Sequence, residues 1–336
     1  MRVFFLLSAV LGSLGGCQTK APDDSAWQRF EYVEPEMGVD FHLKFYAPNR
    51  PEAERIAKAA YERVEELSSI FSDYDPGSEL NRLGRAPVGK PVAVSPELLD
   101  ILQRAQALAR DTRGAFDVTA GPSVRFWRQA RKRGQMPPVQ ELQAAQKRVG
   151  YQQLSLNAVN RTVTLRVANL QLDLGGIAKG YAVDEAMAVL KANGIARAYV
   201  AADSDLLTSG PPPGKVGWKI ELRNVDEFGN LYPRTIFLKH VALSTSGDTE
   251  QFVEINGRRY SHIVDPRTGI GLTGRIQATV IAADSVTADS HATAMCVLGK
   301  QAGLQFADRR QLQSLVLELA GDRPQVTPSR AWKVWE

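Results

Sequence analysis

The feature that most constrains the fold of this chain is a strand, a glycine turn and a helix in direct succession. Residues 170–174 alternate apolar and polar side chains like a short strand, Gly175 and Gly176 follow, and residues 178–190 have helical spacing. Glycines let a ligand approach the backbone closely, while the first N–H groups of a helix and the Lys179 ammonium favour an anion such as a phosphate. A tight turn in which the glycines serve only geometry and Lys179 is solvated is the alternative.

The size and charge of the chain restrict the classes of protein to which it can belong. Its 336 residues, 44% of them hydrophobic, suffice for a large core and fit one large domain or two intertwined ones. The net charge of +4 is spread over nearly equal numbers of basic and acidic residues, without a basic block interleaved with aromatic residues. We therefore expect no nucleic-acid partner.

The first residues predict export and a lipid anchor. A positive start at Arg2, an apolar run over residues 3–14 and small residues ending in Cys17 are typical of an export signal, which is too short to span a bilayer as a mature helix. The order Leu-Gly-Gly-Cys resembles the bacterial lipobox, in which the cysteine is lipidated; an ordinary signal peptide is the alternative. Residues 18–30 are then a tether, and the protein faces the periplasm from the inner or the outer membrane.

Strands and helices are both predicted along the rest of the chain. Asn256-Gly257 gives the strongest hairpin signal, because this pair suits a two-residue turn between strands at 252–255 and 258–264. Further strands are predicted at about 39–45, 154–156, 163–167, 198–201, 218–222, 235–238 and 276–282, and helices at about 51–71, 96–113, 123–133, 139–148 and 285–297. Residues 71–81 are predicted as a turn-rich loop that carries two aromatic rings.

Two residues on the last of these helices have the spacing of cation ligands. Asp289 and Thr293 are four residues apart, so they share one helix face and offer a carboxylate and a hydroxyl to the same hard cation. The residues around them are apolar, and a buried carboxylate needs a counter-charge, which Mg²⁺ would supply. A helix-terminal aspartate beside a threonine that bonds to its own backbone is the alternative.

His262 is the one histidine of four whose setting suggests a chemical role. It lies near the end of a predicted strand, with Asp265 and Arg267 just beyond it. A general base that faces a ligand and a purely structural histidine are both open at this point.

Seven motifs follow one another in order along the chain. They are Met37-Gly38, Phe71-Ser72-x-Tyr74-x-Pro76-x-Ser78-Glu79-Leu80, Gly114-x-Phe116-Asp117-x-Thr119-x-Gly121-Pro122, Leu172 to Asp184, Ser244-Thr245-Ser246-Gly247-Asp248, His262 to Gly269, and Ala288-Asp289-x-x-Ala292-Thr293-Ala294. Together they resemble the ApbE family of FAD:protein FMN transferases, flavin-handling enzymes that bacteria export. The likeness covers about residues 37–313.

The resemblance implies a fold, a reaction and a set of site residues. The fold is α+β, a single large domain over residues 31–336 with mixed, mainly antiparallel sheets and packed helices. The reaction is Mg²⁺-dependent transfer of FMN from FAD to a threonine or serine of an exported redox protein, with release of AMP. Asp289, Thr293 and the carbonyl of Gly176 fall on the metal-ligand positions, and His262 falls on the histidine that activates the acceptor hydroxyl. The flavin-contacting positions are Met37, Tyr74, Ala115, Phe116, Asp117, Asp173, Lys179 and Ile263.

One stretch departs from the family's pattern. The family carries Asn-x-Gly-Gly-Asp where this chain has residues 201–205, in which Asp203 and Ser204 replace the two glycines and Asp205 is kept. The new side chains, and the negative charge of Asp203 above all, are expected to weaken binding of a pyrophosphate. Two other functions therefore stay open: an FAD-binding lipoprotein without catalysis, and an FAD pyrophosphatase that yields FMN and AMP.

Overall fold

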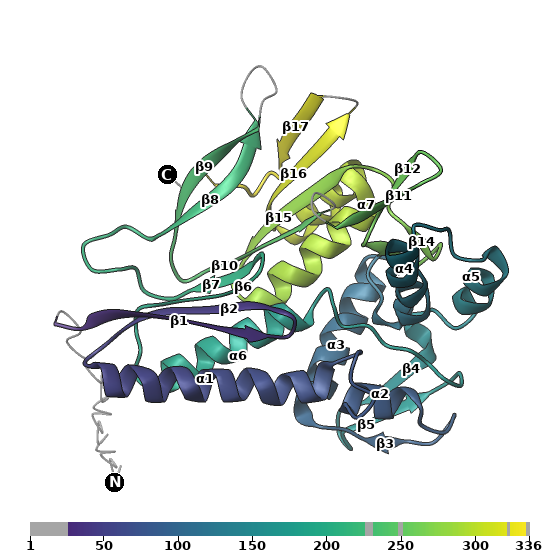
Figure 1. The fold of residues 1–336 in the computed structure, drawn as a ribbon, viewed down its shortest axis with the longest axis horizontal. Helices are drawn as coiled ribbons and strands as arrows, with labels where there is room; N and C mark the ends of the chain where they lie inside the picture. The colour runs from purple at the N-terminus through teal and green to yellow at the C-terminus, as the bar shows by residue number, and fades with distance from the viewer. Residues whose placement is uncertain (1–25, 226–230, 248–250, 321–322, 334–336) are drawn as a thin grey trace, which may run out of the picture.

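The computed structural model describes residues 26–225, 231–247, 251–320 and 323–333, which are built around an eight-stranded sheet (Figure 1). Its strands lie in the order β1-β2-β6-β7-β10-β15-β16-β17, and every pairing within it is antiparallel. The bounds are β1 Gln28–Glu36, β2 Val39–Ala47, β6 Ala198–Ala202, β7 Asp205–Thr208, β10 Ala242–Gly247, β15 Ile276–Ala282, β16 Gln313–Ala320 and β17 Arg323–Pro328. The expected α+β class with mainly antiparallel sheets is confirmed.

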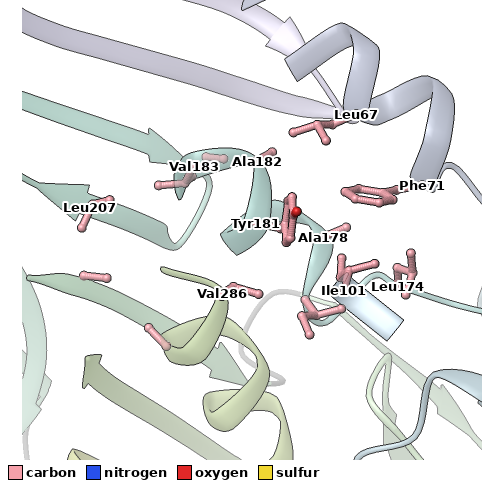
Figure 2. Close-up of a cluster of buried hydrophobic side chains, with 14 of the residues drawn as sticks. Leu67, Phe71, Ile101, Leu174, Ala178, Tyr181, Ala182, Val183, Leu207 and Val286 are labelled. Atoms are coloured by element: carbon pink, nitrogen blue, oxygen red, sulfur yellow. The ribbon is translucent and has the colours of Figure 1, made fainter. Parts of the chain in front are cut away.

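Three long helices cover one face of this sheet, and a hairpin covers the other. The helices are α1 (Arg50–Phe71), α6 (Ala178–Ala192) and α7 (Ser285–Arg310), and the hairpin pairs β8 (Trp218–Val225) with β9 (Leu231–Leu238). Adjacent residues of β7 serve the two faces, as the period of a strand requires: Leu207 belongs to the core under the helices and Leu206 to the core under the hairpin. Figure 2 shows the first of these cores, where Phe71 of α1 meets Tyr181 of α6.

A second group of elements lies beside the sheet and carries loops that border the site. It contains α2 (Glu79–Gly84), β3 (Val92–Ala93), α3 (Pro96–Asp111), α4 (Gly121–Arg133), α5 (Val139–Gln146), β4 (Leu154–Asn157) and β5 (Thr162–Leu165). Two short hairpins complete the fold: β11 (Phe252–Ile255) with β12 (Arg258–Ser261), and β13 (Val264–Asp265) with β14 (Ile270–Gly271). Asn256 and Gly257 both have positive φ, which confirms the predicted two-residue turn.

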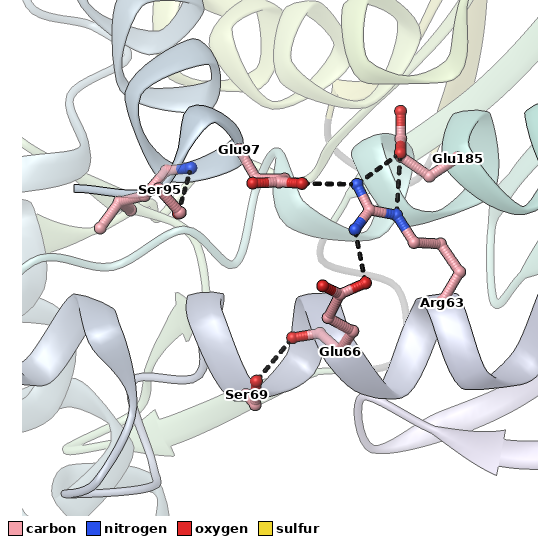
Figure 3. Close-up of polar contacts among 7 residues, drawn as sticks. Arg63, Glu66, Ser69, Ser95, Glu97 and Glu185 are labelled. Carbon is pink, nitrogen blue, oxygen red and sulfur yellow. Dashed lines mark hydrogen bonds and ion pairs between the residues drawn. The ribbon is translucent and has the colours of Figure 1, made fainter. Parts of the chain in front are cut away.

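One arginine connects three of the helices. Arg63 of α1 forms ion pairs with Glu66 at 2.6 Å, with Glu97 of α3 at 2.9 Å and with Glu185 of α6 at 2.7 Å (Figure 3). Its side chain is only 20% exposed, so these pairs are screened less than surface pairs are. The cluster fixes α3 and α6 relative to α1.

Two predicted elements differ from the structure in a way that has a clear cause. Residues 170–174 alternate in burial but form no strand, because their neighbours are not strands: the Asp173 N–H bonds at 2.8 Å to the carbonyl of Val118, in a short 3-10 helix. The predicted loop at residues 71–81 ends early, because the Ser78 hydroxyl accepts a hydrogen bond from the Asn81 N–H and starts α2.

Two predicted boundaries also move. Strand β1 begins at Gln28, before the predicted domain start at residue 31, because Gln28 to Phe30 pair with β2 and Phe30 is buried. The last helix continues past Val297 to Arg310, with a break at Gly299, whose φ is 77°. The predicted signal peptide, Cys17 and most of the predicted tether lie outside the described residues. No helix among the residues that the structure describes combines the length and the apolar character that crossing a membrane requires.

Candidate active site

A cavity of about 1130 Å³ lies between the main sheet and the second group of elements. All the residues that the sequence analysis singles out for ligand, metal or base line it, although they come from distant parts of the chain. They are Met37, Tyr74, Ala115, Phe116, Asp117, Asp173, Gly176, Lys179, His262, Ile263, Asp289 and Thr293. Convergence of so many polar groups on one large cavity is the usual form of a ligand site.

The start of α6 packs closely against α7 at Gly180. A side chain at Gly180 would place its Cβ 2.4 Å from the carbonyl oxygen of Ser285 and 2.8 Å from the Cβ of Asp289, so only glycine fits there. Because the helices approach so closely, the Gly180 N–H donates a 3.0 Å hydrogen bond to Asp289 Oδ2. The carboxylate of Asp289 therefore lies at the positive end of α6. A Cβ at Gly176 would come within 3.1 Å of the Thr293 side chain.

Lys179 is charged and held in place by a buried acid. Its Nζ lies 3.0 Å from Asp205 Oδ2, and Asp205 accepts a 2.5 Å hydrogen bond from the Ser244 hydroxyl. Burial by itself lowers the pKa of Lys179, but the nearby carboxylates of Asp205 and Asp289 outweigh this, and the net pKa is raised. The ammonium is therefore a permanent positive charge on the cavity wall.

The oxygens around Asp289 fit a magnesium ion. Burial, reinforced by the charge of Asp205, raises the pKa of Asp289 to about 7, so a cation beside it would stabilise its charged form. The Thr293 hydroxyl lies 3.0 Å from the hydroxyl of Ser246 and faces the same cavity. The described residues contain no group of three or more His, Cys, Asp or Glu side chains placed to share a metal. A carboxylate, a hydroxyl and the Gly176 carbonyl suit Mg²⁺, which keeps waters and takes phosphate oxygens as further ligands.

Arg128 is a site residue that sequence reasoning missed. Its Nη2 lies 2.7 Å from Asp173 Oδ2, its Nη1 forms an ion pair with Asp73, and its guanidinium lies 4.6 Å from the centre of the Tyr74 ring. Burial raises the pKa of Asp173, and the charge of Arg128 opposes that rise. No sequence signal connects these residues, because α4 comes between Tyr74 and Asp173 in the chain and its arginine resembles any exposed helix residue.

The loop at residues 115–117 and the β1–β2 turn form further parts of the cavity wall. Asp117 is 8% exposed and accepts hydrogen bonds from the N–H and the hydroxyl of Thr119, so its carboxylate shapes the loop. Burial raises the pKa of Asp117. Phe116 is buried against Gly176. Met37, in the turn between β1 and β2, has a φ of 52°, and it lines the cavity.

The ring of His262 is oriented by a backbone carbonyl. Its Nδ1 lies 3.1 Å from the carbonyl oxygen of Gln251, which also accepts the His262 N–H at 3.0 Å. A carbonyl oxygen only accepts hydrogen bonds, so Nδ1 carries a proton, and the neutral ring has its lone pair on Nε2. The neighbouring Ile263 is buried, and its carbonyl accepts the Leu272 N–H at 2.9 Å, which fixes this end of the hairpin.

Residues 201–205, which differ from the family's pattern, contain the turn between β6 and β7. Ala202 pairs with Asp205, so Asp203 and Ser204 occupy the tip, and both line the cavity. Asp203 has a φ of 56°, a conformation that glycine adopts without strain. Its charge adds a smaller rise to the pKa of Lys179, which Asp205 mainly raises, and to the pKa of Asp289, which burial mainly raises. The added carboxylate therefore acts on the groups that face the anion site.

These features define an α+β protein with a glycine turn, a buried lysine and a carboxylate–hydroxyl pair around a cavity large enough for a dinucleotide. The model of the ApbE family matches residues 37–316, and the chain belongs to the ApbE family. It is 29% identical over 327 residues to an FAD:protein FMN transferase of Vibrio cholerae serotype O1, covering 96% of this chain and 95% of the relative.

Two further comparisons agree. An FAD:protein FMN transferase of Chlamydia muridarum is 30% identical over 251 residues, covering 73% of this chain and 77% of the relative. The solved structure of the flavin transferase ApbE from Vibrio cholerae superposes with a TM-score of 0.84 at 28% identity, covering 92% of this chain and all of that one. The fold that the sequence motifs imply is thus the fold of the family.

Proposed function

We propose that this chain is an FAD:protein FMN transferase, which moves the FMN half of FAD onto a serine or threonine of an acceptor protein and releases AMP. The observation that carries the proposal is that one cavity is lined by Lys179 and the glycine turn, which suit a pyrophosphate, and by His262, which suits an acceptor hydroxyl. The names of the relatives support it, since they are FAD:protein FMN transferases.

The step is a displacement at the phosphorus of the FMN half. The acceptor oxygen forms a bond to that phosphorus, the bond from phosphorus to the oxygen bridging to the adenylate breaks, and AMP leaves with that oxygen. His262 takes the hydroxyl proton at Nε2, because Nδ1 is engaged with the carbonyl of Gln251. Lys179 supplies positive charge beside the phosphates, where negative charge shifts during the transfer.

We further propose that Mg²⁺ is bound by Asp289, Thr293 and the carbonyl of Gly176. When bound, the ion neutralises the charge of the pyrophosphate. Asp289 is suited to this role because it is 2% exposed and its Oδ2 is already fixed by the Gly180 N–H. The acceptor would be an exported redox protein, and residues 1–17 would direct this chain to the periplasm with Cys17 as its lipid anchor. Loss of fatty-acid labelling in Cys17→Ser would support the anchor, and unchanged labelling would exclude it.

The test combines the purified full-length chain with FAD, Mg²⁺ and a threonine-containing exported flavoprotein in its flavin-free form. The intact mass of the acceptor and the amount of AMP are measured together. A mass increase of one FMN with an equal amount of AMP, both lost on adding EDTA, is the expected result. AMP and free FMN without an acceptor would indicate a pyrophosphatase, and bound FAD that stays intact would indicate a carrier.

A further inference from the structure

Arg128 lies at the centre of four residues that line one part of the cavity. Its guanidinium contacts the carboxylate of Asp173, forms an ion pair with Asp73 and stacks on the ring of Tyr74. All four side chains border the same cavity, although they come from α4 and from two separate loops. Arg128 is the contact that all three of the others share.

The two acids need the arginine to hold this arrangement. Asp73 and Asp173 carry like charges, and the side chain of Asp173 is only 10% exposed, so its charged form requires a partner. The planar fork of a guanidinium bonds to two carboxylates at once and also stacks on an aromatic face, which a lysine ammonium cannot do. The positions of both Asp173 and Tyr74 therefore depend on Arg128.

Tyr74 is 77% exposed although it lines the cavity. One face of its ring lies against the guanidinium, so the rest of the ring is available to a second flat group. The carboxylate of Asp173, which bonds to the same guanidinium, is an acceptor for hydrogen bonds from ring N–H or amino groups. An aromatic face beside a fixed acceptor is suited to a planar nitrogen heterocycle.

The same aspartate joins this region to the anion site. Asp173 Oδ2 bonds to Arg128, while Oδ1 accepts the Gly175 N–H at 2.8 Å. The heterocycle site and the glycine turn therefore share one carboxyl group. A dinucleotide has this layout, with a ring system on either side of its pyrophosphate.

From this geometry we propose that Arg128 is a positioning residue, which holds Tyr74 and Asp173 as the walls of a slot for one planar ring of the dinucleotide. The inference rests on the proposed function for the identity of the dinucleotide, FAD. Arg128 itself takes no part in the transfer. Its contribution is to ligand affinity, and it acts through the two residues that it orients.

The test measures binding and turnover separately in Arg128→Met and Arg128→Lys. The matched control is Arg125→Met, since Arg125 is an exposed arginine one turn earlier on α4 that does not line the cavity. Binding of FAD, FMN and ADP is titrated by calorimetry without an acceptor, and kcat and KM for FAD are measured with one. The melting temperature of each variant reports its folding.

We expect Arg128→Met to weaken FAD binding and raise KM about tenfold or more, with kcat changed less than about threefold. Arg128→Lys should recover part of the affinity, and Arg125→Met should match the parent. A parallel loss for ADP would assign the slot to adenine, and one for FMN to the isoalloxazine ring; either supports the proposal. Unchanged FAD affinity in both Arg128 variants, or equal losses in Arg125→Met, would overturn it. If the parent transfers no FMN but Arg128→Met still binds FAD more weakly than the parent does, the ring slot is supported and the transferase function is rejected.

Discussion

Asp184 and Asp289 cap each other's helices. Asp184 of α6 accepts hydrogen bonds from the N–H groups of Ser285 and Val286 at the start of α7, at 2.7 and 2.9 Å. Asp289 of α7 accepts one from Gly180 in the first turn of α6, at 3.0 Å. Each helix therefore supplies a carboxyl group that accepts hydrogen bonds at the other's N-terminus, and at α7 this adds to the N-cap of Asp284. The proposed metal ligand is thus positioned by the same contacts that pack the two helices.

The first prediction tests the close approach of these helices. Gly180→Ala should destabilise the protein by about 1–3 kcal/mol, because the new Cβ would overlap the Ser285 carbonyl and push Asp289 away. Urea denaturation measures the change, and loss of FAD turnover should accompany it. Gly274→Ala is the control, since nothing lies within 4 Å of that position. Equal stability of the two variants would contradict the packing described.

The second prediction concerns pH. Burial raises the pKa of Asp184 from 3.8 to about 6, against the effect of its two backbone hydrogen bonds. The folded protein therefore holds this proton more tightly than the unfolded chain does. Below the pKa of the unfolded chain, the carboxyl group does not lower the free energy of unfolding; above the pKa of the folded protein, it lowers that free energy by its full amount.

Asp184→Asn has no such charge to bury. Relative to the parent, the variant should gain roughly 1–3 kcal/mol of stability as the pH rises from about 4 to about 7. Denaturation at several pH values gives the difference between the two proteins, and a difference that does not change with pH would show that the raised pKa is wrong.

The third prediction separates two roles of Lys179: its ion pair with Asp205, which affects stability, and its positive charge, which affects FAD turnover. Lys179→Met should destabilise the protein by about 3 kcal/mol, because it leaves Asp205, which is 1% exposed, without its counter-charge. Adding Asp205→Asn should restore much of that stability but not FAD turnover. A double variant as unstable as the single one would show that the ion pair is not the cause.

The fourth prediction concerns the turn that departs from the family. Asp203→Gly removes a negative charge from the cavity and relieves a positive φ, so FAD should bind about 3- to 10-fold more tightly. Ser204→Gly is the matched control, because it changes the same turn without changing charge. If both variants bind FAD like the parent, Asp203 does not weaken the site.

The fifth prediction tests the proposed base. His262→Ala should lower kcat by roughly 10²- to 10⁴-fold and leave the affinity for FAD nearly unchanged, because the histidine acts on the acceptor hydroxyl. Single-turnover transfer and calorimetry measure the two quantities. A loss of affinity equal to the loss of rate would instead assign His262 to FAD binding.

Local patterns in the sequence predicted much of this molecule. The spacing of Asp289 and Thr293 placed both on one helix face, and the Asn256-Gly257 pair identified its hairpin, because such signals depend on neighbours along the chain. Arg128 and Gly180 were not predicted to matter, because their partners are distant in sequence: Arg128 meets Asp173, and Gly180 meets Ser285.

Residues 170–174 show that a local pattern can also predict an element that does not form. Their alternation reports which side chains are buried, but a strand also needs a strand to pair with, and the fold places none there. The other flavin-contacting positions and the Gly176 carbonyl came from the family resemblance, and the convergence of all these residues on one cavity could not be read from spacing alone.

Helix α4 contacts both the ring slot and the segment that orients the proposed base, His262. Trp127 donates to the Gly269 carbonyl at 2.8 Å and packs on Tyr260, Arg128 holds Asp173, and Arg131 bonds at 3.0 Å to the side chain of Gln251, whose carbonyl orients His262. The proposed base and the ring slot are thus both attached to α4 through side-chain hydrogen bonds. A displacement of α4 would therefore act on Asp173 and, through Gln251, on His262 at the same time.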